Sequence, residues 1–316
     1  MSLITNQSSI SQGKVLSILV TAHNLEDYIT DCMESILLAV GDLLPLCEII
    51  LLDDSSVDRT PSMMMAFANK NKNSSYFRIN LKKIGQVRNY GLSLCSARYI
   101  TMIDGDDIVC KNSLKEIVTL LVKENPDLYI CKLKEYQDAA STQVNYSLSR
   151  AQKTSSHKAI KTFLTHKKFQ AHLGGKVISR KLFTELRFPD YTCYEDAATF
   201  PEILMNARSI YVDENSFYFH RKRNGSLSNT ITAEKISYLA AAVIKMDSLF
   251  GEKYRIYTSC HVIELLNKHY DKISLSQLQI LKGILKKSSK MRFIFNPFIR
   301  FSFKKKYIKL LSKNKY

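Results

Sequence analysis

The first 125 residues alternate short apolar runs with helical patterns, and this alternation restricts the fold more than any other feature of the sequence. The apolar or β-branched runs are at 15–22, 48–52, 76–80 and 99–103. Patterns with helical spacing follow them, at 24–37, 61–70, 86–96 and 112–123. Four strand–helix units in succession predict an α/β fold with an open, mainly parallel sheet and helices on both faces. Because ligands bind beyond the carboxyl ends of the strands in such sheets, we expect the functional site at that edge.

Capping residues set the expected ends of these helices. Asn24 is expected to cap the first helix, with Glu26 and Asp27 in its first turn, where the helix dipole favours carboxylates. Pro61 suits the first turn of the second helix, and Pro126 ends the fourth.

The rest of the chain is less regular. It predicts a strand at 128–135, helices at 158–169 and 176–186, short strands at 210–212 and 217–220, and mainly helices from 233 onward. We therefore expect a polar extension over 1–14, a sheet-containing domain over 15–225 and a helical region over 226–316.

The net charge of +17 is concentrated at the carboxyl end. No acidic residue follows Asp271, whereas 13 lysines and arginines do, which leaves 33 basic and 29 acidic residues before that point. A protein coated for nucleic-acid binding would spread its charge differently, so we expect no nucleic-acid partner for the body of the chain. The basic tail is residues 286–316.

The lack of a targeting pattern and the spacing of the cysteines both indicate a reducing compartment. The longest apolar run is far shorter than the roughly 20 residues that span a bilayer, and residues 1–14 lack a secretory signal pattern, so a cytoplasmic protein is expected. The seven cysteines form no Cys-x-x-Cys pair, which favours buried reduced thiols over disulfides or structural zinc.

Carboxylates follow two of the expected strands. Asp53 and Asp54 end the second strand, where one could face a ligand while the other holds a turn; a turn with a helix cap is the alternative. Asp104, Asp106 and Asp107 follow the fourth strand, and three carboxylates within four residues repel one another unless a cation is near. Mg²⁺ or Mn²⁺ bound with substrate phosphates suits such a cluster, whereas a simple Asp-Gly turn is the alternative.

A further acidic pair, Glu195 and Asp196, opens a helical pattern, which by itself favours a capping role. Four blocks of the chain, however, resemble the family 2 glycosyltransferases, which are inverting enzymes with the GT-A fold, particularly bacterial members that build surface polysaccharides. The blocks are SILVTAHNLEDYITDCMESIL, EIILLDDSSVDRT, QVRNYGLSLCSARYITMIDGDD and YEDAATFPEIL, and the resemblance covers residues 15–225.

The resemblance implies a GT-A, Rossmann-like sheet with flanking helices, a nucleotide-binding half (15–107) and an acceptor half (108–225), followed by the helical basic region. It implies a UDP-sugar donor, with Asp53 or Asp54 on the uracil and ribose and Thr21 and His23 in the same pocket. Arg88, in a segment similar to the family's glycine- and arginine-containing block, would hold the nucleotide or its helix.

The resemblance also assigns metal and catalytic roles. Asp104 would face the ribose and a metal, and Asp106 the metal, Mn²⁺ or Mg²⁺, that bridges the diphosphate. Asp196 would be the general base, with Glu195 orienting acceptor hydroxyls or supporting Asp196.

The segment 220–228 resembles a family segment that ends in Arg-x-x-Gly-Ser. Arg221 and Arg223 would contact the diphosphate. His220 is either a further metal ligand or an ordinary packed histidine. Lys176 and Arg180 lie in a segment that resembles one near the acceptor, although a structural role is as reasonable.

The predicted activity is transfer of one sugar, with inversion, to a hydroxyl of a glycan acceptor on a lipid carrier. The sequence lacks the Gln-x-x-Arg-Trp motif of processive synthases. The alternatives are a metal-dependent nucleotidyltransferase, which would need a glycine-rich loop that TAHNLEDYI lacks, and a nucleic-acid-binding protein acting through the tail.

The tail mixes aromatic residues with cations, and Pro297 divides it into two amphipathic pieces. Such pieces are typical of segments that lie on an anionic membrane surface, so we expect a cytoplasmic enzyme associated peripherally with the inner membrane. Packing of the aromatic residues on the enzyme is the alternative.

Overall fold

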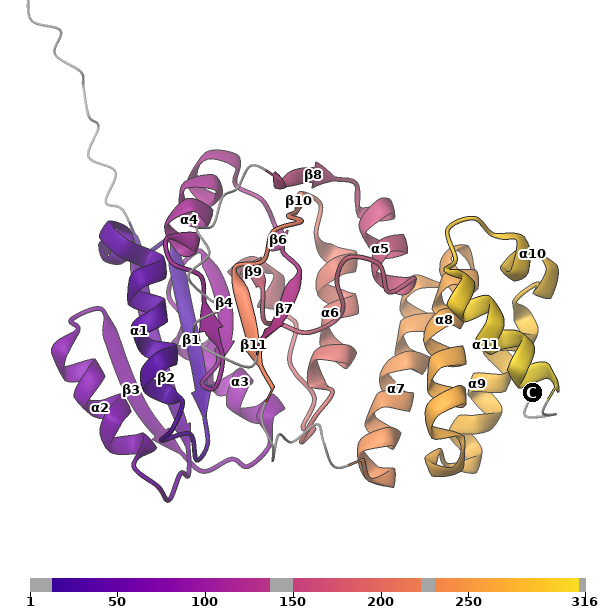
Figure 1. Ribbon diagram of the computed structural model, residues 1–316, viewed down its shortest axis with the longest axis horizontal. Coiled ribbons are helices and arrows are strands. Elements are labelled where there is room, and N and C mark those ends of the chain that lie inside the picture. Colours follow the sequence, from indigo (N-terminus) through magenta and orange to yellow (C-terminus); the bar gives the residue numbers. More distant parts are fainter. Residues whose placement is uncertain (1–12, 137–149, 223–230, 313–316) are drawn as a thin grey trace, which may run out of the picture.

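The main β-sheet and its covering helices lie at one end of the molecule, and a bundle of helices lies at the other end (Figure 1). The computed structural model describes residues 13–136, 150–222 and 231–312. The main sheet has eight strands in the order β3-β2-β1-β4-β9-β6-β10-β8. Their bounds are β1 Leu16–Ala22, β2 Cys47–Asp54, β3 Ser74–Ile79, β4 Tyr99–Asp104, β6 Leu128–Ile130, β8 Gln152–Thr154, β9 Lys176–Ser179 and β10 Ile210–Val212.

The first four strands of this sheet are parallel, as the alternating pattern predicts. Every residue of β1 is buried, because helices cover both faces. On one face, Ile18 and Val20 pack with α1 (Ile29–Val40), α2 (Thr60–Lys70) and α4 (Ser113–Glu124). On the other, Leu19 packs in the core shared with α3 (Ile84–Leu94), α5 (Ser156–Leu164) and α6 (Glu195–Asn206).

A second sheet of three strands lies beside the end of β4. Its order is β5-β11-β7, with bounds Ile108–Val109, Tyr218–Arg221 and Leu133–Tyr136. Strand β11 is antiparallel to β5 and parallel to β7. This small sheet brings residues 218–221 next to the Asp-Gly-Asp-Asp segment, more than a hundred residues earlier in the chain.

Two of the expected elements are wrong. The segment 176–186 is strand β9 followed by a 3-10 helix (Arg180–Phe183), because Val177 and Ile178 are buried between β4 and β6 and pair with both. The single strand expected at 128–135 is two strands, β6 and β7, which belong to different sheets.

Asn24 does not cap a helix. Helix α1 begins at Ile29, and Asn24 has a left-handed backbone with φ of 52°. Its Oδ1 accepts a hydrogen bond from the Val57 N–H, and its own N–H donates to Ser56 Oγ. Asn24 therefore ties the loop after β1 to the loop after β2, which keeps the ends of the two strands together.

The carboxyl-terminal region is helical, as expected. Its helices are α7 (Ala233–Phe250), α8 (Glu252–His269), α9 (Leu275–Lys287), α10 (Lys290–Phe295) and α11 (Phe301–Ser312). Helix α7 packs on α6, α8 on α7, and α11 on α8. None of the helices in the described part of the chain is long and apolar enough to cross a membrane.

The basic tail is divided between packed and exposed apolar residues. Phe293, Ile299, Phe303, Tyr307 and Leu310 are buried in the core that α8 and α9 share. Other apolar residues of the tail point to solvent: Met291, Phe295, Phe298, Phe301 and Ile308. Packing on the enzyme thus accounts for the first group of tail residues, whereas the second group is exposed to solvent.

Candidate active site

The carboxyl ends of β1, β2 and β4 meet at one edge of the sheet. In the strand register Ala22 lies opposite Asp53, and Thr21 lies opposite Asp104. The Thr21 hydroxyl donates to Asp104 Oδ1 at 3.4 Å. The polar residues expected from the strand pattern are therefore gathered at a single edge.

The two neighbouring aspartates at the end of β2 make different contacts. Asp53 is fully buried; its Oδ1 accepts from the Ser56 N–H at 3.2 Å, and its Oδ2 lies 3.5 Å from Arg78 Nε. Among the described residues no hydrogen-bond donor reaches this Oδ2. Asp54 instead accepts from the N–H groups of Leu81 and Lys82, each at 2.8 Å.

An open hollow of about 420 Å³ lies beside these aspartates, at the ends of β2 and β3. Its lining residues are Ser55, Arg78, Ile79 and Asn80. His23 is exposed nearby, with its Nδ1 2.6 Å from the Asp54 carbonyl oxygen. Three of the four lining residues are polar, and a hollow of this volume suits a small polar ligand.

Arg88 connects the sheet edge to the start of α6. Its side chain is only 8% exposed; Nη2 donates to Asp104 Oδ1 at 3.1 Å and Nη1 pairs with Glu195 Oε1. Because Asp104 ends β4 and Glu195 opens α6, this one side chain joins the two acidic segments. A buried charge between two carboxylates is compensated, which a buried ion requires.

The adjacent carboxylates of α6 have pKa values that are pushed apart. Burial raises the pKa of Glu195 to about 7, although the charge of Arg88 lowers it. Burial acts in the same direction on Asp196, but there the contact with His172 and the charges of His172 and Arg88 outweigh it and hold the pKa at about 2. Asp196 is therefore the ionised member of the pair near neutral pH, as a proton acceptor must be.

The cluster after β4 is organised around Asp107. This buried carboxylate accepts from the Tyr218 hydroxyl at 2.6 Å and from the Arg221 N–H at 2.8 Å, and His220 Nδ1 lies 3.2 Å from its Oδ1. Asp107 thus belongs to the framework, whereas Asp104 and Asp106 are only half-buried and can be reached by a ligand.

These residues fit a metal that is shared with a diphosphate. Within the described ranges no group of three His, Cys, Asp or Glu side chains could hold a metal without other ligands. Mg²⁺ and Mn²⁺ in phosphate sites need only one or two carboxylates besides the phosphate oxygens, and Asp104 and Asp106 can supply these. His220 is oriented through Nδ1 by a carboxylate, an arrangement common among metal-binding histidines.

The remaining cations differ in position. Arg221 Nε donates to the Asp106 carbonyl oxygen at 3.0 Å, and its Nη2 pairs with Asp31 at 2.9 Å. Arg223 lies outside the described residues. Lys176 is buried close to Asp196, whereas Arg180 donates to the Ala97 carbonyl oxygen at the opposite edge of the sheet, which favours a structural role for Arg180.

Three residues of the site had no role in the sequence-based interpretation. Arg78 pairs with Asp53, His172 pairs with Asp196, and Tyr218 bridges Asp104 and Asp107. Only Tyr218, which lies in the apolar run just before the basic segment 220–223, had a local signal that could have drawn attention to it.

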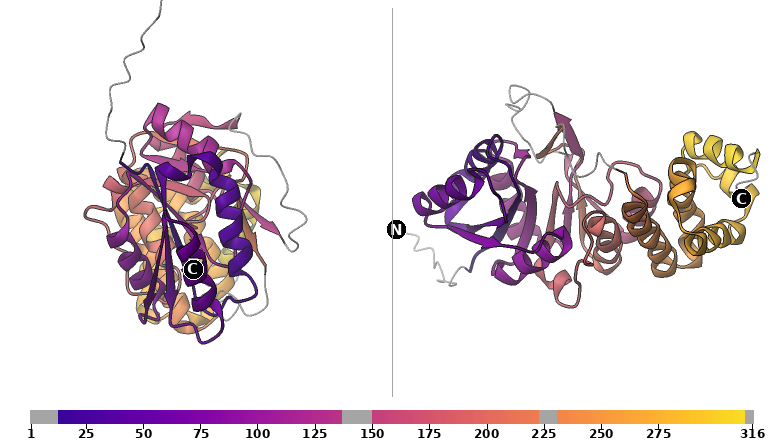
Figure 2. Two further views of the ribbon diagram at one scale, coloured as in Figure 1. Left: turned by 90° about the vertical axis from the view of Figure 1, so that its left-hand side faces the viewer. Right: turned by 90° about the horizontal axis from the view of Figure 1, so that it is seen from below.

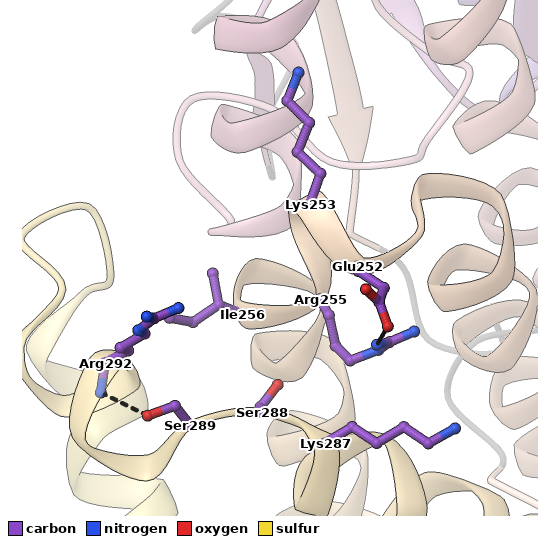
Figure 3. Close-up of a pocket in the computed structure, with 8 residues that line it drawn as sticks. All are labelled: Glu252, Lys253, Arg255, Ile256, Lys287, Ser288, Ser289 and Arg292. Atoms are coloured by element: carbon purple, nitrogen blue, oxygen red, sulfur yellow. Dashed lines mark hydrogen bonds and ion pairs between the residues drawn. The ribbon is translucent and has the colours of Figure 1, made fainter.

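A second hollow lies in the helical region, between α8 and the start of α10. Its cations do not converge: Lys253 and Lys287 extend away from each other, and Arg255 turns to Glu252 (Figure 3). Ser288 hydrogen-bonds Ser259. This hollow lacks the converging charges of an anion site.

Residues 17–187 match the family model described as glycosyl transferase family 2. The chain belongs to this family. The matched segment contains nearly all of β1 to β4, the Asp-Gly-Asp-Asp cluster and Arg88, so the resemblance to the family is confirmed; three of the four blocks lie within it, and the block with Glu195 and Asp196 follows it. Family membership also favours a glycosyltransferase over the nucleotidyltransferase and nucleic-acid-binding alternatives.

Similar family 2 proteins include GlyG from Streptococcus pneumoniae serotype 4 (strain TIGR4), described as a glycosyltransferase. It is 26% identical over 227 residues, which are 69% of this chain and 74% of GlyG. TarS from Staphylococcus aureus (strain Mu50), a poly(ribitol-phosphate) beta-N-acetylglucosaminyltransferase, is 24% identical over 262 residues. These are 80% of this chain but 44% of TarS.

The GT-A fold is confirmed by a crystal structure of S. aureus TarS residues 1–349 in complex with UDP-GlcNAc. Its TM-score is 0.66 at 19% identity, and the match covers 95% of this chain and 89% of that chain. The shared fold extends through the helical region of this family 2 chain, beyond the segment that the family model covers.

Proposed function

We propose that this chain is a UDP-sugar-dependent, inverting glycosyltransferase that adds one sugar to a hydroxyl of a bacterial surface glycan. The observation that carries the proposal is the buried Arg88, which joins Asp104 at the sheet edge to Glu195 beside Asp196. Relatives with related activities support it, among them the N-acetylglucosaminyltransferase TarS and the minor teichoic acid biosynthesis protein GgaA of Bacillus subtilis (strain 168).

Asp196 would act as the general base. It takes the proton of the acceptor hydroxyl while that oxygen bonds to the anomeric carbon of the donor. The bond between this carbon and the diphosphate oxygen breaks on the opposite face, so the configuration inverts and UDP leaves. A carboxylate whose pKa is held at about 2 is ionised over the whole physiological range, ready to accept the proton.

Asp104 and Asp106, with His220 beside them, would hold Mg²⁺ or Mn²⁺ against the donor diphosphate. The ion supplies positive charge that stabilises the leaving UDP. Arg221, and Arg223 beyond the described residues, would add charge-assisted contacts to the phosphates. On the nucleotide side, Asp53 and Asp54 with Arg78 would bind the uracil and ribose at the hollow after β2, flanked by Thr21 and His23.

The acceptor is proposed to be a glycan on a lipid carrier, reached at the inner face of an anionic membrane. The exposed apolar residues of α10 and α11 support this, since they lie among cations that anionic lipid attracts. Within the chain, the proposed division is a donor half (15–107), an acceptor half (108–225) and a membrane-facing helical region (226–316).

The test is UDP release from a panel of UDP-sugars, with Mn²⁺ or with EDTA, by the wild type, Asp106→Ala and Asp42→Ala. Asp42 pairs with Lys115 on the surface and serves as the control. We expect metal-dependent release with one sugar, lost in Asp106→Ala and unchanged in Asp42→Ala. If calorimetry detects no binding of UDP in the presence of metal, the proposal fails.

A further inference from the structure

Both oxygens of the Asp196 carboxylate have partners. Oδ1 accepts from the Ala197 N–H at 2.6 Å, and Oδ2 lies 3.5 Å from His172 Nδ1. The His172 side chain is 59% exposed, whereas that of Asp196 is 17% exposed. His172 is therefore the more exposed member of the pair and covers part of the Asp196 carboxylate at Oδ2.

The backbone of His172 is held by a buried cation. The Lys176 ammonium donates to the His172 carbonyl oxygen and lies 4.6 Å from the centroid of the Phe200 ring. Phe200 follows Asp196 by four residues in α6, so the two side chains share a face of that helix. Helix α6 thus supports both Asp196 and, through Lys176, the segment that carries its partner.

Two glycines allow this segment to approach the framework of the site. A Cβ atom on Gly174 would lie 2.6 Å from the Tyr218 ring, and one on Gly175 would lie 2.9 Å from Cys131 Sγ. Gly175 also has φ of 75°, which side chains rarely tolerate. The short segment from His172 to Lys176 is therefore fixed at both ends, which an orienting side chain requires.

We propose that His172 is a positioning residue for Asp196, holding Oδ2 so that the carboxylate faces the acceptor hydroxyl. This inference rests on the proposed function, because it assumes that Asp196 is the base. His172 makes no covalent bond in the reaction; the proton still moves from the acceptor oxygen to Asp196.

The charges around Asp196 indicate what loss of His172 would do. Arg88 of α3, Lys176 of β9, Glu195 of the same helix, and Cys193 and Tyr194 before it all interact electrostatically with Asp196. His172 is the leading contribution that lowers the pKa of Asp196, against the opposing effect of burial. Removing the imidazole would therefore raise the pKa of Asp196.

The kinetic test compares His172→Ala and His172→Asn with the wild type, using the UDP-sugar that the wild type turns over. Alanine removes the contact, whereas the asparagine amide can place a donor where Nδ1 lies. We expect His172→Ala to lower kcat about 10- to 100-fold, less than the 10²- to 10⁴-fold contribution of a base. The KM for the donor should change little, and the acid limb of kcat/KM should move to higher pH.

His172→Asn should restore most of kcat and return the acid limb toward that of the wild type. His157→Ala is the control, since His157 is exposed on α5 and contacts Tyr254. An unchanged kcat and acid limb in His172→Ala would overturn the proposal. Equal losses in both His172 variants, with an unmoved acid limb, would also overturn it.

A second measurement needs no substrate. Long-range ¹H–¹⁵N correlation spectra at pH 8.5 report which ring nitrogen of each neutral histidine carries the proton, and the His172 signals are assigned by their loss in His172→Asn. We expect His172 to carry the proton on Nδ1 in the wild type and to lose this preference in Asp196→Asn. No difference between the two proteins overturns the inference. If the two proteins differ clearly but the wild type neither binds UDP nor turns over UDP-sugars, the result supports the contact between His172 and Asp196 and contradicts the proposed function.

Discussion

Arg88 is the residue on which the charge balance of the site depends. Its guanidinium lies between Asp104 and Glu195, and no hydrogen-bond partner of Nε is found among the described residues. A buried ion pair contributes little net stability compared with apolar packing, but removal of one partner leaves the other charge buried and uncompensated. Arg88 therefore fixes the geometry of the site more than it stabilises the fold.

Replacement of Arg88 should produce a pH-dependent loss of stability. In Arg88→Ala the unfolding free energy should fall by about 3–5 kcal/mol, because Glu195 loses its counter-ion. In the wild type the folded state keeps the Glu195 proton to a higher pH than the unfolded chain does, so stability is lost as pH rises from the ordinary pKa of a glutamate through about 7. Because Arg88 lowers this pKa, its removal raises the pKa further, and the variant goes on losing stability above pH 7. The deficit should be larger at pH 8 than at pH 5.

This prediction is measured by urea denaturation at the two pH values. Arg59→Ala is the control; Arg59 pairs with Glu26 at the surface, and its loss should cost less than about 1 kcal/mol at either pH. A deficit for Arg88→Ala that is the same at both pH values, or larger at pH 5, would contradict the assignment of the raised pKa to Glu195.

The residues of the site were predictable only where the chain carries a local signal. Asp53, Asp104 and Asp106 follow apolar strands, and their position at the sheet edge follows from the parallel topology. His172 has no such signal, because its partner is Asp196 and the segment between them forms strand β9 and a loop. Contacts of this kind depend on the path of the chain in space.

At the scale of elements, helix α3 is joined to the segment before α6. Gly85 N–H donates to the Tyr191 carbonyl oxygen at 3.3 Å, and the Asn89 side chain exchanges two hydrogen bonds with the backbone of Phe188. Gln86 adds a bond to Asp190 at 2.7 Å. This seam sets the distance between Arg88 and Glu195.

A methyl group at Gly85 should open the seam. The Cβ of alanine would lie 1.8 Å from the Pro189 carbonyl oxygen, a backbone atom that cannot turn aside. Gly85→Ala should lose about 1–3 kcal/mol of stability and most of the UDP-release activity. Gly283→Ala, in α9 with open space around it, should gain about 0.5–1 kcal/mol, so thermal shifts of opposite sign are expected. Equal shifts would contradict the tight contact.

The elements that the sequence predicts well are those with long uniform patterns. Strands β1, β2 and β4 are continuous apolar runs, and they lie where expected to within one or two residues at each end. Strand β9 was expected as a helix because four residues are too few to show a period of two. The split between β6 and β7 follows from partners in two sheets, which no local pattern records.

At the scale of the whole molecule, the tail lies at the end opposite the N-terminal half of the sheet (Figure 2). Packing of Phe303 and Tyr307 on the core makes removal of residues 286–316 damaging to the body, so deletion is a poor test of what the tail binds. Point substitutions of exposed residues separate surface binding from stability. Phe295 and Phe301, 72% and 74% exposed, are suitable for this.

Sedimentation with vesicles tests the proposed membrane face. The wild type should bind vesicles of phosphatidylglycerol but not of phosphatidylcholine, and less as salt rises, because lysines near an anionic surface contribute about 1 kcal/mol each. Phe295→Ser with Phe301→Ser should weaken binding about 10-fold or more without lowering thermal stability. Val57→Ser, at a residue that is 89% exposed in the loop after β2, is the control. Equal binding to both lipids at low salt would contradict the proposal.

The long separation between Arg88 and Glu195 also has a consequence during translation. At a synthesis rate of about 5–20 residues per second, the ribosome needs roughly 5–20 s to add the 107 residues that follow Arg88, up to and including Glu195. Strands β1 to β4 are complete during this interval, before Glu195 exists to pair with the arginine. A nascent chain that stalls before α6 would present a nucleotide half in which Arg88 has Asp104 as a partner but lacks Glu195, so the site stays incomplete until α6 is made.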